Sequence, residues 1–437
     1  MASITSLTTL ASAKRGPKER SGVHLWHPYY AGYSEAFVDS AIKYLDLNRE
    51  LILLDPWNGS GTTAFVASRF GIQTVGCEIN PVMNIFSAAK SGFLLGQERL
   101  IKEILEDIKN QTLHSSLKIC DQDPLLDFMS ESLSACIRNL YKVIDFYKYP
   151  KYPLAAKLLK ASTSKKSLLN PFEAFFKAAL FIVARKLAGY KGGSNPTWVK
   201  TLTTKPEYHI QDVISQLDKV INFMIRELEL SNIPLLDAVL HLPLEADSRN
   251  LCIRSQSIDG IITSPPYLTR IDYAMSTRPE LLITSNPKTL RTIREETIGA
   301  PVIVDKSIEI SSTWGETCLT LLEHVKSHKS KAAISYYLPN MLQYFRDIEC
   351  SLREIIRVLK SKSQALVVVQ SSFFKEHAVD LGQIYVELIR SLSAHCEIVS
   401  REVIRGHMAH ANTRSNQYKK NKVYYEDVVC INRADSP

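Results

Sequence analysis

The chain contains the stretch LILLDPWNGSGTT at residues 51–63, and its two halves predict different local structures. The apolar residues Leu51–Leu54 fit a short buried strand. Two glycines, Gly59 and Gly61, follow in a turn where the backbone can adopt positive φ and approach a ligand closely. Residues 64–70 then have helical spacing. Strand, glycine-rich turn and helix form the unit with which open α/β sheets bind nucleotides.

The residues around this turn restrict the class of ligand. No lysine follows the second glycine, so the turn lacks the pattern of a phosphate-binding loop, and it also lacks the third glycine of the dinucleotide fingerprint. Asp55 ends the first strand, where a carboxylate suits a positive group such as an ammonium. A second expected strand, Thr74–Cys77, ends at Glu78, the position at which an acid holds ribose hydroxyls. The predicted ligand is a nucleoside with a cationic tail, and S-adenosylmethionine has that composition.

A second stretch, IDGIITSPPY at residues 258–267, predicts a rigid turn after another apolar run. Pro265 and Pro266 lack N–H groups and fix φ, so neither helix nor strand continues through them. The turn is expected at the carboxyl end of a strand, where such sheets bind ligands. Ser264 and the carbonyl of Pro265 can accept the two hydrogens of an amine, and Tyr267 can stack on a planar ring. Taken alone, the stretch fits a simple strand-capping turn equally well.

Together, DPWNGSGTT (residues 55–63) and TSPPY (residues 263–267) resemble the motifs of the S-adenosylmethionine-dependent DNA amino-methyltransferases, which modify cytosine N4 or adenine N6. HPYYAGY at residues 27–33 is similar to the family's upstream His-Pro-Tyr segment, with Gly32 and Tyr33 in place of the usual Lys-Phe. The resemblance implies an α/β fold, a Rossmann-like methyltransferase sheet with helices on both faces, and a mostly helical insertion.

The resemblance also implies which residues form the site. The catalytic residues would be Ser264, Pro265, Pro266 and Tyr267. An acid after a third expected strand (residues 238–240) would contact the adenine amine of S-adenosylmethionine, although a helix N-cap fits Asp247 equally well. The residues expected to bind this cofactor are Asp55, Pro56, Trp57, Gly59, Ser60, Gly61, Thr62, Glu78, Ile79, Asp247, His27 and Tyr29. No metal is expected, because a sulfonium is already an activated methyl donor.

The function implied by the resemblance is site-specific methylation of the exocyclic amine of a flipped base in double-stranded DNA. Serine at the first position of SPPY is commonest among cytosine-N4 enzymes, so cytosine N4 is favoured. A restriction-modification or related defence system, with a companion restriction endonuclease, is the expected setting. The alternatives are an adenine-N6 DNA methyltransferase, an RNA base methyltransferase, and a catalytically silent DNA-binding subunit of methyltransferase-like fold.

Composition is consistent with a globular protein that has a polyanionic partner. The 437 residues include 53 basic and 45 acidic side chains, which give a net charge of +8. The eight cysteines include no Cys-x-x-Cys pair, and no apolar run reaches the roughly 18 residues of a membrane span. A cytoplasmic location with reduced cysteines is therefore expected.

Pattern and composition divide the chain into four parts. We expect a flexible basic tail (1–20), a cofactor-binding part (21–90), a helical insertion that is a candidate for DNA recognition (91–236), and a catalytic part (237–437). Residues 276–330 have no clear periodicity and are expected to be irregular. Basic or aromatic residues in loops are the candidate DNA contacts: Arg270, Tyr273, Lys191, Lys200, Arg405 and Arg414.

Overall fold

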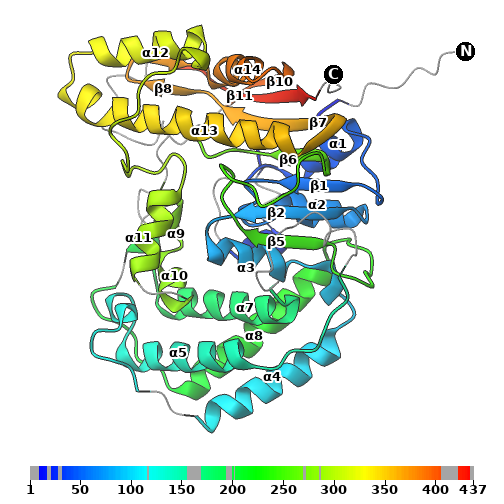
Figure 1. Cartoon of the computed structure of the whole chain (residues 1–437). Helices are drawn as coiled ribbons and strands as arrows, with labels where there is room; N and C mark the ends of the chain where they lie inside the picture. The colour runs from blue at the N-terminus through cyan, green and yellow to red at the C-terminus, as the bar shows by residue number, and fades with distance from the viewer. Residues whose placement is uncertain are drawn as a thin grey trace, which may run out of the picture.

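In the computed structural model of the protein, one mixed sheet forms the centre and helices pack around it (Figure 1). The residues that the structure describes are 9–16, 21–27, 32–115, 118–154, 169–192, 199–200, 202–268, 272–284, 287–404 and 422–433.

The sheet has seven strands in the order β10-β11-β7-β6-β1-β2-β5. Their bounds are β1 (Ile52–Asp55), β2 (Gln73–Glu78), β5 (His241–Glu245), β6 (Ile258–Thr263), β7 (Leu359–Gln370), β10 (His395–Ile404) and β11 (Tyr424–Asn432). The five strands from β7 to β5 are parallel, whereas β11 pairs antiparallel with both β7 and β10. This arrangement confirms the Rossmann-like methyltransferase sheet.

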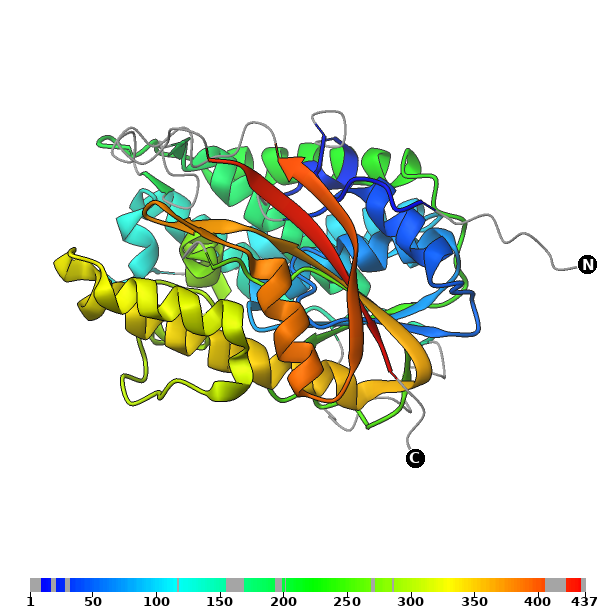
Figure 2. The ribbon, with the colours of Figure 1, turned by 90° about the horizontal axis from the view of Figure 1, so that it is seen from above.

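Each face of the sheet buries its own apolar cluster, because side chains alternate along a strand. On β7, Leu366 and Val368 belong to one cluster, and Val367 and Val369 belong to the other. Figure 2 shows α1 and α14 on opposite sides of β7 and β11. The helices of the first face include α1 (Glu35–Tyr44), α2 (Thr62–Arg69) and α3 (Pro81–Ala89), and those of the second include α12 (Glu316–Ser327), α13 (Leu338–Val358) and α14 (Leu381–Ser391).

Most described residues between α3 and β5 are helical, and they gather beyond β5 in the lower part of Figure 1. The long helices are α4 (Glu98–Leu113), α5 (Glu131–Phe146), α7 (Pro171–Leu187) and α8 (Ile210–Glu229), and β3 (Lys191–Gly192) pairs with β4 (Val199–Lys200). Helix α7 is buried around most of its circumference and packs against α3, so this region continues the core of the first face. The domain boundaries at 90 and 236 stay a prediction.

Two sequence-based expectations of local structure were wrong. The third strand begins at His241 rather than at residue 238, because Val239 donates its N–H to Pro153 and bridges Leu154 outside the sheet. Residues 276–330 are not irregular: they contribute to α9 (Tyr273–Ser276) and form α10 (Arg278–Thr284), α11 (Pro287–Glu296) and α12. Three of these helices are short, and short helices depend on tertiary packing more than on periodicity.

Short elements complete the description. They are the 3₁₀ turns η2 (Gly22–Leu25), η3 (Gly92–Leu94), η4 (Pro124–Asp127) and η5 (Ser312–Trp314), the π-helical turn η6 (Ala333–Tyr337), and the hairpin of β8 (Ser372–Phe374) with β9 (His377–Val379). Among the described helices, none combines the length and apolarity that crossing a bilayer requires. All eight cysteines are free thiols.

Replacing Phe175 by alanine tests the core contributed by α7. Its ring is fully buried and lies 5.9 Å from Trp26 and 6.1 Å from Phe176 between ring centres. We expect Phe175→Ala to lower the free energy of unfolding by about 3–5 kcal/mol, measured by urea denaturation. Phe146→Ala is the matched control, because that ring is 75% exposed and its loss should change stability little. Equal effects of the two substitutions would contradict the assignment of α7 to the core.

Candidate active site

A cavity at the carboxyl edge of the sheet joins the two sequence motifs. Its walls come from the ends of β1, β2, β5 and β6 and from residues around α9 and after α11. The lining residues are Pro56, Trp57, Cys77, Glu78, Ile79, Asn80, Met83, Ala246, Asp247, Ser248, Ser264, Pro265, Pro266, Tyr267, Tyr273, Thr277, Glu296, Thr297 and Ile298. The structure therefore brings the SPPY turn beside Pro56 and Trp57 of the glycine-rich stretch.

The glycine-rich turn follows directly after Pro56 and Trp57, which line the cavity. Gly61 has φ of +82°, and a Cβ there would lie 2.2 Å from Oγ of Ser87, so only glycine fits. Lys90 Nζ donates to the carbonyl of Ser60 at 2.8 Å, and this hydrogen bond holds the turn in place. Gly59, Ser60, Gly61 and Thr62 shape the site without belonging to the lining of the cavity.

Glu78 connects the end of β2 to the glycine-rich turn. One carboxylate oxygen accepts the N–H of Gly59 at 3.0 Å, and the other accepts the N–H of Asn80 at 2.9 Å. Burial raises the pKa of Glu78 to about 7, against the opposing effect of these hydrogen bonds. A carboxylate oxygen has more than one acceptor site, so Glu78 can also accept hydroxyls from a ligand in the cavity.

Asp55 differs from its expected role, because its carboxylate does not line the cavity. The side chain is 3% exposed and accepts hydrogen bonds from Tyr33, Thr63, Thr263 and the backbone of Trp57. Burial raises the pKa of Asp55, whereas the hydrogen bonds from the three hydroxyls oppose the rise. The expected contact with a ligand's ammonium remains a prediction that this geometry does not favour.

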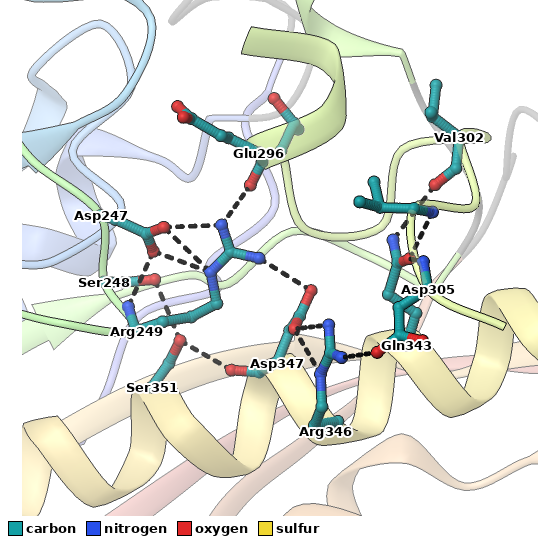
Figure 3. A network of polar contacts seen from close by, with 12 residues as sticks. Asp247, Ser248, Arg249, Glu296, Val302, Asp305, Gln343, Arg346, Asp347 and Ser351 are labelled. Atoms are coloured by element: carbon teal, nitrogen blue, oxygen red, sulfur yellow. Dashed lines mark hydrogen bonds and ion pairs between the residues drawn. The ribbon is translucent and has the colours of Figure 1, made fainter. Parts of the chain in front are cut away.

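Asp247 lines the cavity and anchors a polar network at its rim (Figure 3). Its carboxylate binds Arg249 through three side-chain contacts of 2.6–3.0 Å. Arg249 also contacts Asp347 at 3.0 Å and the carbonyl of Glu296 at 2.9 Å. The N-cap role considered for Asp247 is wrong, because the chain from residue 246 to 257 forms no helix. Contact with an adenine amine stays a prediction.

The SPPY turn presents hydrogen-bond acceptors. The hydroxyl of Ser264 donates to the carbonyl of Val368 at 3.1 Å and also hydrogen-bonds with the side chain of Tyr267, which leaves one lone pair of its oxygen for a further donor. The carbonyl of Pro266 accepts the hydroxyl of Tyr344 at 3.0 Å. Among the described residues, no hydrogen bond reaches the carbonyl of Pro265. Ser264 and Pro265 thus supply an acceptor pair beside the cavity.

Glu426 is an acidic residue beside this turn that sequence reasoning missed. Burial, and then the charge of Glu426, raise the pKa of Tyr267 above its usual value. Oε1 of Glu426 is buried without a hydrogen-bond partner in the described chain. Burial raises the pKa of Glu426 to about 7, and Glu402 adds to the rise while Lys14 opposes it. Glu426 lies in β11, whose sequence gives no signal of proximity to Tyr267.

The remaining predicted contacts are only partly described. Tyr273 lines the cavity. His27 is 5% exposed and lies 5.0 Å from the ring of Phe86, and burial lowers its pKa well below the usual value. His27 does not line the cavity. Lys191 and Lys200 are paired in the backbone register of β3 and β4. Tyr29, Arg270, Arg405 and Arg414 lie outside the described residues.

The donor set of the cavity fits a nucleoside ligand. Trp57 contributes an indole Nε1–H that is buried and has no hydrogen-bond partner among the described residues, and Glu78 contributes a carboxylate. Apolar contact comes from Ile79, Met83 and Ile298. Within the described ranges, no three His, Cys, Asp or Glu side chains are grouped so that they could hold a metal ion. These residues fit S-adenosylmethionine, whose chemistry the two motifs imply.

Curated relatives were found among Type II methyltransferases. M.BsoBI of Geobacillus stearothermophilus is 24% identical over 305 residues, 65% of this chain and 57% of the relative. M.MjaII of Methanocaldococcus jannaschii is 25% identical over 59% of this chain and 61% of the relative. M.MvaI of Kocuria varians is 22% identical over 85% of this chain and 82% of the relative. This chain is similar to Type II methyltransferases. The resemblance drawn from the motifs is thereby confirmed, although the chain spans only about three fifths of the first two relatives.

Other comparisons add little. No protein-family model matches the chain. Similar solved structures include the YcgJ protein from Bacillus subtilis, with a TM-score of 0.33 at 7% identity over 91% of this chain and 98% of that one. The rRNA methyltransferase aviRa from Streptomyces viridochromogenes has a TM-score of 0.32 at 10% identity over 96% of both chains. The assignment of the fold comes from the strand order of the sheet and not from these similar structures.

Glu426 provides a pH test of the site. Its pKa rises from the usual 4.5 to about 7 on folding, so its contribution to stability is present below about 4.5 and is lost as pH rises through 7. We expect the free energy of unfolding of Glu426→Gln to fall less between pH 5 and pH 8 than that of the unmodified protein, by urea denaturation. Glu397→Gln, at an exposed position of β10, should retain the original pH dependence. Parallel profiles for all three proteins would show that Glu426 titrates normally.

Proposed function

We propose that this protein is a site-specific DNA methyltransferase that uses S-adenosylmethionine and modifies the exocyclic amine of a flipped base, with cytosine N4 as the favoured target. The observation that carries the proposal is the single cavity lined by Trp57 and Glu78 on one side and by Ser264–Tyr267 on the other. A nucleoside site and an amine-binding turn in one cavity are what a methyl transfer to a base amine requires. Similarity to Type II methyltransferases supports the proposal.

The cofactor side of the cavity would be held by residues of β1, β2 and β5. Glu78 accepts the ribose hydroxyls, and Asp247, Ile79 and Trp57 surround the remainder of the ligand. The loop after β1 carries Gly59, whose N–H already fixes the Glu78 carboxylate. When bound, S-adenosylmethionine supplies a methyl group on a positively charged sulfonium, so the electron-rich carboxylates at this edge favour its binding.

The chain's own residues would activate the amine by hydrogen bonding. An exocyclic amine is a poor nucleophile because its lone pair is delocalised into the ring. Ser264 Oγ and the carbonyl of Pro265 accept its two N–H groups, which draws the nitrogen toward tetrahedral geometry and frees the lone pair. Bound S-adenosylmethionine would supply the methyl group to this nitrogen, and solvent would take up the proton that the amine loses. The Ser264 hydroxyl hydrogen is already directed to Val368, so this residue acts as an acceptor and not as a base.

The target base must leave the duplex to reach this cavity. Tyr267 is half-buried beside the acceptor pair and offers a ring face for stacking, which offsets the lost base stacking. The net charge of +8 favours association with duplex DNA. Serine in place of aspartate or asparagine at position 264 favours cytosine N4 over adenine N6. We also propose a companion restriction endonuclease, because the similar proteins are named Type II methyltransferases.

Replacing Ser264 by alanine tests the amine site. We expect at least a roughly 100-fold slower methylation of duplex DNA, equivalent to about 2.7 kcal/mol in the barrier, because one acceptor is lost. Affinity for S-adenosylhomocysteine should change by less than about threefold, because the cofactor side is untouched. Ser391→Ala, on α14, is the control.

The same assay identifies the product. Methylated DNA is digested to nucleosides, and N4-methyl-2′-deoxycytidine is expected in the digest. N6-methyl-2′-deoxyadenosine would replace the cytosine assignment by adenine, and the absence of any methylated nucleoside with the unmodified protein would refute the function.

Replacing Glu78 by glutamine tests the cofactor side. Loss of charge-assisted hydrogen bonds, each worth about 1.5–3 kcal/mol, should weaken S-adenosylhomocysteine binding about 10- to 100-fold by calorimetry. Glu245→Gln is the matched control, because Glu245 pairs in register with Glu78 at the end of β5 but is exposed. Unchanged affinity in Glu78→Gln would place the ribose elsewhere.

A further inference from the structure

The carboxylate of Asp55 is surrounded by donors from four parts of the chain. One oxygen accepts the hydroxyl of Thr263 at 2.6 Å and the N–H of Trp57 at 3.1 Å. The other accepts the hydroxyls of Thr63 at 2.6 Å and of Tyr33 at 2.8 Å. All three hydroxyl-bearing side chains are buried. Because every contact is internal and Asp55 does not line the cavity, an ammonium group of a ligand has no direct approach to this carboxylate.

The position of Asp55 in the sheet explains why such a cluster matters. Strands β1 and β6 share only two register pairs, Leu53 with Gly260 and Leu54 with Ile261. At the carboxyl end, the side-chain bond from Thr263 to Asp55 continues the pairing where the backbone ladder stops. Asp55 thus connects the two strand ends that carry the two halves of the site.

The opposite end of the same strand pair has a corresponding contact. Asp259 accepts the N–H of Ile52 at 3.0 Å and binds Lys360 at 2.5 Å. A carboxylate therefore accepts a hydrogen bond across each end of the β1–β6 pairing. Only the end at Asp55 lies beside the cavity. Asp259 provides a matched control for the effect of Asp55.

We propose that Asp55 is a positioning residue that holds the glycine-rich turn and the SPPY turn at a fixed separation, and that it does not bind the ammonium group of the cofactor. The inference rests on the proposed function and deepens it. Thr263 directly precedes Ser264, and Trp57 lines the cofactor side of the cavity, so Asp55 contacts the residues adjoining both reactants. A displacement of about 1 Å between reacting groups can slow a reaction about 100-fold.

Asp55→Asn and Asp259→Asn form the first comparison, in the full-length chain. Single-turnover methylation at saturating DNA and cofactor should be about 100-fold slower in Asp55→Asn and within about threefold of the unmodified rate in Asp259→Asn. Both substitutions should lower Tm. An equal loss of rate in the two variants would overturn the proposal, because the effect would then follow stability alone.

Two ligands separate positioning from ammonium binding. S-adenosylhomocysteine carries the amino-acid group, whereas 5′-methylthioadenosine lacks it. In Asp55→Asn, calorimetric affinities for both should fall by the same factor. A loss confined to S-adenosylhomocysteine would show that Asp55 binds the amino-acid end and would overturn the proposal. This comparison needs no DNA, so it decides the role of Asp55 even if the unmodified protein methylates no DNA and the proposed function fails.

Thr263 provides a variant that retains the carboxylate. Thr263→Val removes one hydroxyl donor with little change of shape, and Thr263→Ser keeps the donor. We expect slow single-turnover methylation in Thr263→Val and recovery to within about threefold of the unmodified rate in Thr263→Ser, since the geometry depends on the hydrogen bond. A normal rate in Thr263→Val, or an equally slow rate in Thr263→Ser, would contradict the positioning role. These variants also decide the question if Asp55→Asn does not fold.

Discussion

The parallel pairing of β1 with β6 is the constraint on which the rest of the site depends. It brings together residues 208 positions apart, Asp55 and Thr263, at one edge of the sheet. The entropy cost of closing a loop grows only slowly with its length, so a long insertion between the two strands is tolerated. What the fold must secure is the relative position of two strand ends, and backbone pairing alone supplies only two register pairs for this.

Burial of acids near the cavity gives this edge of the sheet a distinct electrostatic character. Asp55, Glu78 and Glu426 all have raised pKa values with burial as the largest cause. Each carboxylate would be more stable as an anion if a positive charge arrived nearby. A cationic ligand in the cavity and the carboxylate of Glu78, which lines it, therefore favour one another, whereas a phosphorylated ligand would meet like charge there. The electrostatics agree with the absence of a phosphate-binding pattern in the glycine-rich turn.

The motifs predicted the fold and the meeting of the two turns well, because their signals are local. Glycine at position 61 and proline at position 265 each indicate the local backbone conformation directly. The role expected for Glu78 follows from its position at the end of a strand. The sequence could not reveal Glu426 or Thr277, because each reaches the site only through tertiary structure. Asp55 lies at the strand end where it was expected, but the sequence could not reveal its hydrogen-bond donors Tyr33 and Thr263, because they come from distant segments. The helices within residues 276–330 were missed because their stability comes from contacts such as Arg185 with Glu280.

The burial of α7 limits how residues 91–236 could be exchanged for those of another protein. Exchanging residues 91–236 with those of a relative would be the obvious modular graft. Such a graft would remove a helix whose side chains fill the space against α3 and whose Arg185 holds α10 beside the cavity. A graft that retained α7 would also have to keep α5, because α5 packs against α7 and α10, and its Arg138 donates to the carbonyl of Ile283 in α10 at 2.7 Å.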